Sequence, residues 1–428
     1  MANGIKDFNV RYGVLALPIA MVALPIYIYI PKFYGHELGI PIEVVGLILL
    51  CMRIFDAAQD PFIGFLSDKQ SRKFTRKRII LIGSPFLIIG FLAIFNPLTA
   101  SSSGHAVWLS ISLIVVYFGL SVVYINYLAI GTELGQSSHE HTEIAGSRAF
   151  FGVTGIILAL IIPEALSSQF NSQAQGLSVF STAFLPFFLI SLLIFSRVNC
   201  RTAVVASEKR RVFSQLVAPF LNTRFKKLLI VFIFSGLANA IPGLLILFFV
   251  EDILQSKELS WLFVLIYFLS SGLAIPLWTY MAKRFGKKLT WQIGMGLAIF
   301  SFFWAFFLEP HQTIIFALIC VISGTANGSD LTIPFSILSD QIKQDNSKLI
   351  PQTNAGYFGV WQFVEKTNLG IAAGLSLPIL GLLNYQPGEL NSNRDALQLM
   401  YAIVPCVLKF SAMVCLIALK IEKNNYEN

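Results

Sequence analysis

Charged residues are scarce in this chain, which has 428 residues of which 13% are Asp, Glu, Lys or Arg. Soluble domains carry roughly 25%. Hydrophobic residues make up 55% of the sequence, and they are collected in runs of about 20 residues rather than in amphipathic stripes. This composition excludes a large soluble protein. The formal charge of +8 does not indicate a nucleic-acid partner, because the basic residues lie in short loops, where they set membrane topology.

Cysteine is also sparse, and the motifs of catalysis are missing. Five scattered cysteines form neither a CxxC pair nor a disulfide framework. The chain has no HExxH and no GxSxG motif. The segment HEHTE (139–143) places two histidines i,i+2 in what we expect to be a short loop, which is poor spacing for zinc. We therefore expect no enzyme activity, no metal and no cofactor. The N-terminal MANGIKDFNVRYG lacks a signal-peptide layout, so we expect the first helix to be retained.

What the chain has instead is twelve apolar runs long enough to cross a membrane. They lie at 12–34, 43–66, 79–99, 107–131, 147–166, 177–197, 228–250, 259–282, 289–308, 313–338, 355–383 and 398–420. The loop SDKQSRKFTRKR and the turn AKRFGKK are strongly basic, whereas alternate loops such as NPLTASSSGHA are not. By the positive-inside rule, both termini are expected to be cytoplasmic in a bacterial-type inner membrane.

A long polar stretch near the middle divides the runs into two groups of six. We predict an N-terminal six-helix bundle at 1–197, a cytoplasmic linker at 198–226 and a C-terminal bundle at 227–428. The basic turns RKFTRKR and KRFGKK lie about half a chain apart, which favours duplicated halves or a positive-inside bias acting twice. The predicted fold is an all-α membrane protein of two pseudo-symmetric bundles. We expect a monomer in contact with membrane lipid, a small-molecule substrate and no nucleic acid.

The second run contains three charges, which are costly inside a membrane and need a reason. Asp56 and Asp60 are four residues apart and share one helical face with Arg53, and Pro61 follows. Two carboxylates one turn apart suit a bare cation, because their oxygens replace its hydration shell. The alternative is a structural salt bridge from Arg53 to either aspartate. One arginine cannot neutralise both acids, so we favour the cation site.

Other helices contribute further polar candidates. Lys366 lies well inside the eleventh run beside Glu365, either as a counter-charge to a carboxylate across the cavity or as a snorkelling lysine. Asp330 in the tenth run either binds substrate or pairs with Lys366 or Lys409. We take the following as substrate or coupling candidates: Arg53, Lys366, Tyr124, Asp330, Asn126 and Trp361.

Two further expectations concern helix ends and helix shape. Glu133 lies near the end of the fourth run and Arg148 opens the fifth, so the two form a gate, a structural pair or a solvated surface pair. Gly324, Gly328 and Pro334 surround Asp330 and predict an irregular helix that lines a cavity.

Longer segments resemble one known family. RIFDAAQDPFIGFLSDKQSRKFTRKR, INYLAIGTEL with SRAFFG, PFSILSDQIKQDNSK, and YFGVWQFVEKTNLGIAAGLSLPILGLLNYQPG resemble the glycoside–pentoside–hexuronide:cation symporters, the melibiose permease branch of the major facilitator superfamily. The resemblance covers nearly the whole chain. It implies that Asp56, Asp60 and Ser121 bind the coupling cation and that Lys366 is the family's helix 11 lysine.

The sequence departs from melibiose permease at two places. Carboxylates on helices 1 and 4 hold the sugar there, whereas this chain has Tyr124 and the uncharged segment ALPIAMVALP. Gln59 replaces a smaller Asn that helps set cation preference, which leaves sodium and proton open. The resemblance implies symport of a sugar or glycoside with Na+ or H+ by alternating access. The alternatives are a transporter of lipid or another amphipathic solute, an uncoupled facilitator, and a non-transporting membrane scaffold or receptor.

Overall fold

The computed structural model describes the chain in segments that are almost entirely helical. The described residues are 10–70, 75–99, 101–134, 138–170, 172–198, 220, 222–346, 354–389 and 393–418. No strand occurs in these ranges. An all-helical fold suits a membrane, because each helix satisfies its backbone N–H and C=O groups internally where no water is available.

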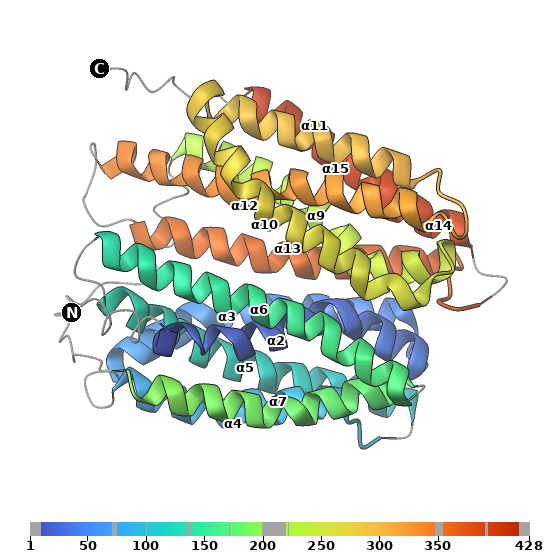
Figure 1. Cartoon of the computed structure of the whole chain (residues 1–428), viewed down its shortest axis with the longest axis horizontal. Helices are drawn as coiled ribbons and strands as arrows, with labels where there is room; N and C mark the ends of the chain where they lie inside the picture. Colours follow the sequence, from blue (N-terminus) through green and yellow to red (C-terminus); the bar gives the residue numbers. More distant parts are fainter. Residues whose placement is uncertain are drawn as a thin grey trace. The chain divides into compact units, whose positions relative to one another are not determined.

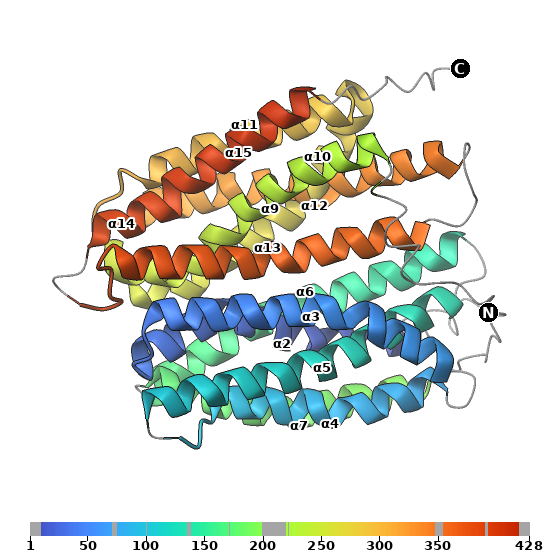
Figure 2. The ribbon, with the colours of Figure 1, turned by 180° about the vertical axis from the view of Figure 1, so that it is seen from behind.

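The chain forms two compact units, Met1–Arg210 and Arg211–Asn428. The helices of the first unit run from blue to green in Figures 1 and 2. They are α2 (Ala16–Lys32) with the π-helical turn η1 (Phe33–Glu37), α3 (Ile42–Gln70), α4 (Arg76–Phe95), α5 (Ser102–Leu134), α6 (Ser138–Phe170) and α7 (Gln173–Ser196).

The second unit contains another six long helices with short turns at their ends. The long helices are α9 (Thr223–Phe248), α10 (Ser260–Phe285), α11 (Lys287–Ala305), α12 (Thr313–Asn346), α13 (Asn354–Leu382) and α15 (Val404–Ala418). The short elements are η3 (Phe249–Ile253), η4 (Lys257–Leu259), α14 (Arg394–Gln398) and η5 (Leu399–Ile403). The twelve long helices of the described chain coincide with the twelve predicted runs, which confirms the predicted architecture.

Nine spans within the described residues are long and apolar enough to cross a membrane. The other three long helices are α3, α11 and α13, and each carries charges inside or at the start of its sequence. Large apolar side chains such as Leu273, Ile314 and Leu382 are about four-fifths exposed. Exposed apolar surface on this scale fits lipid rather than water as the surrounding medium.

The two basic turns have equivalent structural roles in the two units. Lys77 at the start of α4 donates its Nζ to the carbonyl oxygens of Ser196, at 2.8 Å, and Val198 at the end of α7. Lys288 at the start of α11 donates to the carbonyl oxygen of Ile417, at 2.8 Å, near the end of α15. In both units a lysine satisfies carbonyl groups at the negative end of a helix. This shared use supports the duplicated plan.

The expected irregularity of the tenth predicted helix is wrong, because α12 is continuous through its glycines. A Cβ at Gly324 would lie 2.3 Å from the backbone oxygen of Tyr267, and one at Gly328 would lie 2.7 Å from that of Ser271. Asn327 between them donates to the Ser271 hydroxyl at 3.0 Å. The glycines therefore let α12 pack closely on α10.

We expect Gly324→Ala to lower the melting temperature of the purified protein. The new methyl group meets backbone, which cannot turn away as a side chain would, and such overpacking costs about 1 to 3 kcal/mol. Gly296 of α11 is the matched control, because a Cβ there meets nothing within 4 Å. Gly296→Ala should be neutral or slightly stabilising. Equal melting temperatures for the two variants in detergent would contradict this packing role.

Candidate functional site

Three charged residues lie in the middle of α3, and α3 packs against α5. Asp56 is 1% exposed and Asp60 is half-buried. The spacing of three and four residues places Arg53, Asp56 and Asp60 on the same face. The site therefore begins with two carboxylates one helical turn apart, of which Asp56 is buried.

Ser121 of α5 joins the two carboxylates. Its Oγ lies 2.6 Å from Asp60 Oδ1 and 3.2 Å from Asp56 Oδ1. A hydroxyl has one proton and can donate to only one of these oxygens at a time. The arrangement gathers oxygen atoms of three side chains in a small volume, and oxygen is the ligand that hard cations prefer.

Two further contacts of Asp56 help to orient its carboxylate. Arg53 lies 3.4 Å from its Oδ2, and Gln59 donates to its Oδ1 at 3.4 Å. The Arg53 guanidinium also stacks over the ring of Tyr117, 4.8 Å from the centroid. Arg53, Asp56 and Asp60 together carry a formal charge of −1. A cation of one charge would neutralise the group, which is the physical advantage of placing one there.

Sequence reasoning missed two participants in this part of the molecule. Tyr117, one turn before Ser121 on α5, supports the arginine, and Ser67, seven residues after Asp60 on α3, contacts α5. Helical spacing from the named residues would have pointed to both. Asn126, a predicted substrate residue, is fully buried and donates to Ser67 Oγ at 2.9 Å. The structure thus places Asn126 between helices, whereas Tyr124 is 39% exposed.

Of the two predicted gate residues, only Arg148 has a side chain that the structure describes. The helix α6 begins at Ser138, so Arg148 lies within it and does not open it, and residues 139–143 are helical rather than a loop. Arg148 interacts with the hydroxyl of Tyr12. Tyr12 stacks on Tyr127 with ring centroids 4.6 Å apart. The side chain of Glu133 lies outside the described residues, so its pairing with Arg148 stays a prediction.

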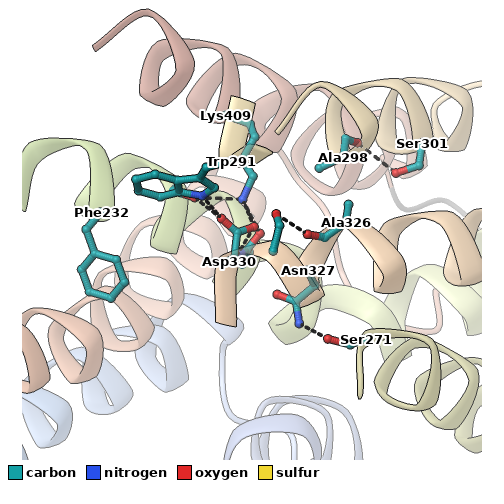
Figure 3. Close-up of polar contacts among 12 residues, drawn as sticks. Phe232, Ser271, Trp291, Ala298, Ser301, Ala326, Asn327, Asp330 and Lys409 are labelled. Atoms are coloured by element: carbon teal, nitrogen blue, oxygen red, sulfur yellow. Dashed lines mark hydrogen bonds and ion pairs between the residues drawn. The ribbon is translucent and has the colours of Figure 1, made fainter. Parts of the chain in front are cut away.

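Asp330 pairs with Lys409 of α15, one of the two partners proposed from the sequence. The Lys409 Nζ lies 2.5 Å from Asp330 Oδ2, and both side chains are less than a tenth exposed. Trp291 donates to Asp330 Oδ1 at 2.8 Å. Figure 3 shows the indole and the ammonium group converging on this carboxylate from different helices.

Two residues of α9 complete this polar cluster. Ser235 donates to Asp330 Oδ1 at 2.9 Å, and Asn239 donates to Oδ2 at 3.2 Å. Lys409 donates in turn to Ser235 Oγ and Asn239 Oδ1 at 2.9 and 2.8 Å. A carboxylate offers about four acceptor positions and an ammonium three protons. The pair therefore neutralises its own charge and uses its hydrogen-bonding capacity within unit 2.

The α13 candidates occupy different environments. Trp361 is 4% exposed and stacks on Phe232 with ring centroids 3.7 Å apart, inside the hydrophobic core of unit 2. Lys366 is half-buried. This placement gives Trp361 a packing role, and the role of Lys366 in coupling stays a prediction.

Comparison with known proteins agrees with this architecture. Residues 11–423 match the family model described as MFS/sugar transport protein. The chain is 25% identical to an uncharacterized symporter, YjmB, of Bacillus subtilis (89% of this chain, 85% of that protein). It is 23% identical to a glucuronide carrier protein homolog of Escherichia coli (90% and 86%). It is 24% identical to the sodium-dependent lysophosphatidylcholine symporter 1 of Mus musculus (80% and 71%).

A solved structure shows the same fold. The nucleoside transporter NupG superposes with a TM-score of 0.70 at 16% identity, over 98% of this chain and 99% of that one. The family match spans nearly the whole chain, and the relatives named above are described as symporters or a carrier rather than as enzymes. The chain is therefore an integral membrane secondary transporter of the MFS/sugar transport protein family, in its glycoside–pentoside–hexuronide:cation symporter branch.

Proposed function

We propose that the protein is a sodium-coupled symporter of a small organic solute of the sugar or glycoside class. The observation that carries the coupling is the oxygen cluster of Asp56, Asp60 and Ser121, whose charged group bears a formal −1 with Arg53 included. A monovalent cation that binds there brings the formal charge of Arg53, Asp56 and Asp60 to zero and favours one conformation of the carrier. Coupling is reciprocal, so a solute that binds the same conformation tightens cation binding by the same factor.

Two observations favour sodium over the proton as the proposed coupling ion. Five carboxylate and hydroxyl oxygens from three side chains offer the coordination that a dehydrated metal cation needs, whereas a proton needs only one of them. A relative, the mouse symporter named above, is described as sodium-dependent. The proton is the alternative, and it would bind on one of the two aspartates.

An amphipathic or lipid-like solute is the second candidate substrate. The helix 1 segment ALPIAMVALP carries no charge, and Tyr124 exposes an aromatic ring on α5. A sugar needs several fixed hydrogen-bond partners, because its hydroxyl groups lose their water on binding. These positions supply few of them, and a relative transports lysophosphatidylcholine according to its name.

We expect proteoliposomes to accumulate a glycoside or hexuronide when an inward sodium gradient is imposed. Radiolabelled solutes of the two classes, a glucuronide and a lysophospholipid, should be compared under sodium, potassium and proton gradients of equal size. Sodium-driven accumulation of the glucuronide supports the proposal, and accumulation of the lysophospholipid alone selects the second substrate class. Equilibration without accumulation under all three gradients would show an uncoupled facilitator and overturn the coupling.

A further inference from the structure

The polar stripe of α3 continues beyond the aspartates toward the C-terminal end of the helix, which the basic segment SRKFTRKR follows. Ser67 follows Asp60 by seven residues, which is two helical turns, so both lie on the same face. Gly64 lies between them on that face, four residues after Asp60 and three before Ser67. The stripe leads from the candidate cation site toward the loop that the positive-inside rule places in the cytoplasm.

A buried oxygen at the far end of this stripe has an unfilled acceptor. Asn126 is fully buried, and its amide nitrogen donates to Ser67 Oγ at 2.9 Å and to the Val122 carbonyl oxygen at 2.8 Å. These two bonds use both amide protons and fix the orientation of the side chain. Among the described residues, nothing donates to Asn126 Oδ1. Buried carbonyl oxygens normally accept a hydrogen bond, and a cation can take the place of the donor.

Gly64 keeps space open between the two ends of the stripe. A Cβ at Gly64 would meet nothing within 4 Å. Other glycines of the same unit serve close packing, since a Cβ at Gly83 or Gly90 would lie 2.6 or 2.4 Å from α5. Glycine in a helix interior is destabilising relative to alanine, and packing does not account for it at position 64. By helical spacing, the open position lies between Asp60 and Ser67 on the same face of α3.

We propose that Asn126 Oδ1 and Ser67 Oγ form a second station for a monovalent cation, reached from the Asp56–Asp60 site past Gly64. The inference rests on the proposed function, since it assumes that a cation occupies the first site. The second station has only neutral oxygens, so it holds a cation more weakly than two carboxylates do. Weak, successive oxygen sites allow an ion to leave as well as to enter. The station therefore lies on the path by which sodium exchanges with the cytoplasmic side.

The first test adds a negative charge at the second station in a variant whose first-site carboxylates have been neutralised. The full-length protein is melted in detergent in sodium, with potassium at equal ionic strength as the reference. The Asp56→Asn, Asp60→Asn background should show no sodium response. Adding Asn126→Asp to it should restore a sodium-specific rise in melting temperature, whereas adding Asn126→Leu should not.

The results separate the two hypotheses. Equal melting in sodium and potassium for the Asn126→Asp triple variant would overturn the second station, while a sodium response of the wild-type protein would still uphold the first site. A wild-type protein without any sodium response would instead overturn the proposed sodium coupling. A melting temperature of the triple variant that is higher in sodium than in potassium supports the station. If Asn126 had only a structural role, its replacement by Asp would destabilise the protein equally in both salts.

A second variant tests the path in a protein whose ligands are all intact. Gly64→Val fills the open position, and Gly152→Val in α6 is the matched control, since a Cβ there also meets nothing within 4 Å. We expect Gly64→Val to slow the exchange of radiolabelled sodium across proteoliposomes by about tenfold, which corresponds to a barrier higher by about 1.4 kcal/mol. The sodium concentration for half-maximal stabilisation should not change. Exchange as fast as in Gly152→Val would overturn the path.

Discussion

Replacing Asp56 and Asp60 together by Asn is expected to abolish the stabilisation that sodium gives to the wild-type protein. A ligand that binds only the folded state stabilises it by RT ln(1 + [L]/Kd), which is about 2.7 kcal/mol at a hundredfold excess over Kd. The double substitution keeps the size of both side chains but changes the charge of the Arg53, Asp56 and Asp60 group from −1 to +1. A cation is then repelled from the site that attracted it.

The measurement is the melting temperature of the purified protein in detergent as sodium replaces potassium at constant ionic strength. The series should be repeated with lithium and across pH, because a response of the wild-type protein to pH alone would select proton coupling. Glu43→Gln is the matched control, since Glu43 opens the same helix at a distance from the aspartates. It should keep the full sodium response. A double variant that responds as the wild type does would refute the cation site.

Ser121 provides an intermediate case in the same experiment. Ser121→Ala removes one neutral ligand and leaves both charges, and a hydrogen bond or ligand contact to a charged group is worth about 1.5 to 3 kcal/mol. The sodium concentration for half-maximal stabilisation should rise by about tenfold or more, without loss of the maximal effect. An unchanged value would show that the serine only joins the helices.

Neutralising Lys409 alone is expected to lower the stability of the folded protein far more than neutralising Lys409 and Asp330 together. Lys409→Met leaves the Asp330 carboxylate buried and uncompensated among Ser235, Asn239 and Trp291. Breaking a buried ion pair from one side costs about 3 to 5 kcal/mol because it leaves an uncompensated buried charge, whereas replacing both partners leaves none. The double variant Asp330→Asn, Lys409→Met should therefore recover most of the lost stability.

The recovery is measured as the yield of monodisperse protein in size-exclusion chromatography and as its melting temperature. Lys283→Met at an exposed position near the end of α10 is the control, and a change within about 0.5 kcal/mol is expected there. The same double variant also decides the role of the pair. Normal folding with normal solute accumulation would assign it to helix packing, and normal folding without accumulation would assign Asp330 or Lys409 to transport itself.

The fold was predictable from the sequence to within a few residues at most helix ends, because the relevant signals are local. A run of about 20 apolar residues forms a helix in a membrane whatever its neighbours are. The shared face of Asp56 and Asp60 also follows from spacing alone, since the α-helical period is fixed. The glycines around Asp330 show the limit of local signals. Sequence indicated an irregular helix, whereas α12 uses them to approach α10 closely.

The partners of each charge were decided by tertiary structure. Ser121 reaches aspartates that are 65 and 61 positions away in the chain, and helical periodicity alone cannot pair two helices. Asp330 had two candidate lysines in the sequence, and the packing of α15 against α9 and α11 selects Lys409 by bringing its ammonium group within 2.5 Å. The unfilled oxygen of Asn126 is likewise invisible in the sequence, because it exists only after both amide protons have found acceptors. Composition and period determined which helices form and which faces are polar, and the rotation and packing of those helices determined which polar groups meet.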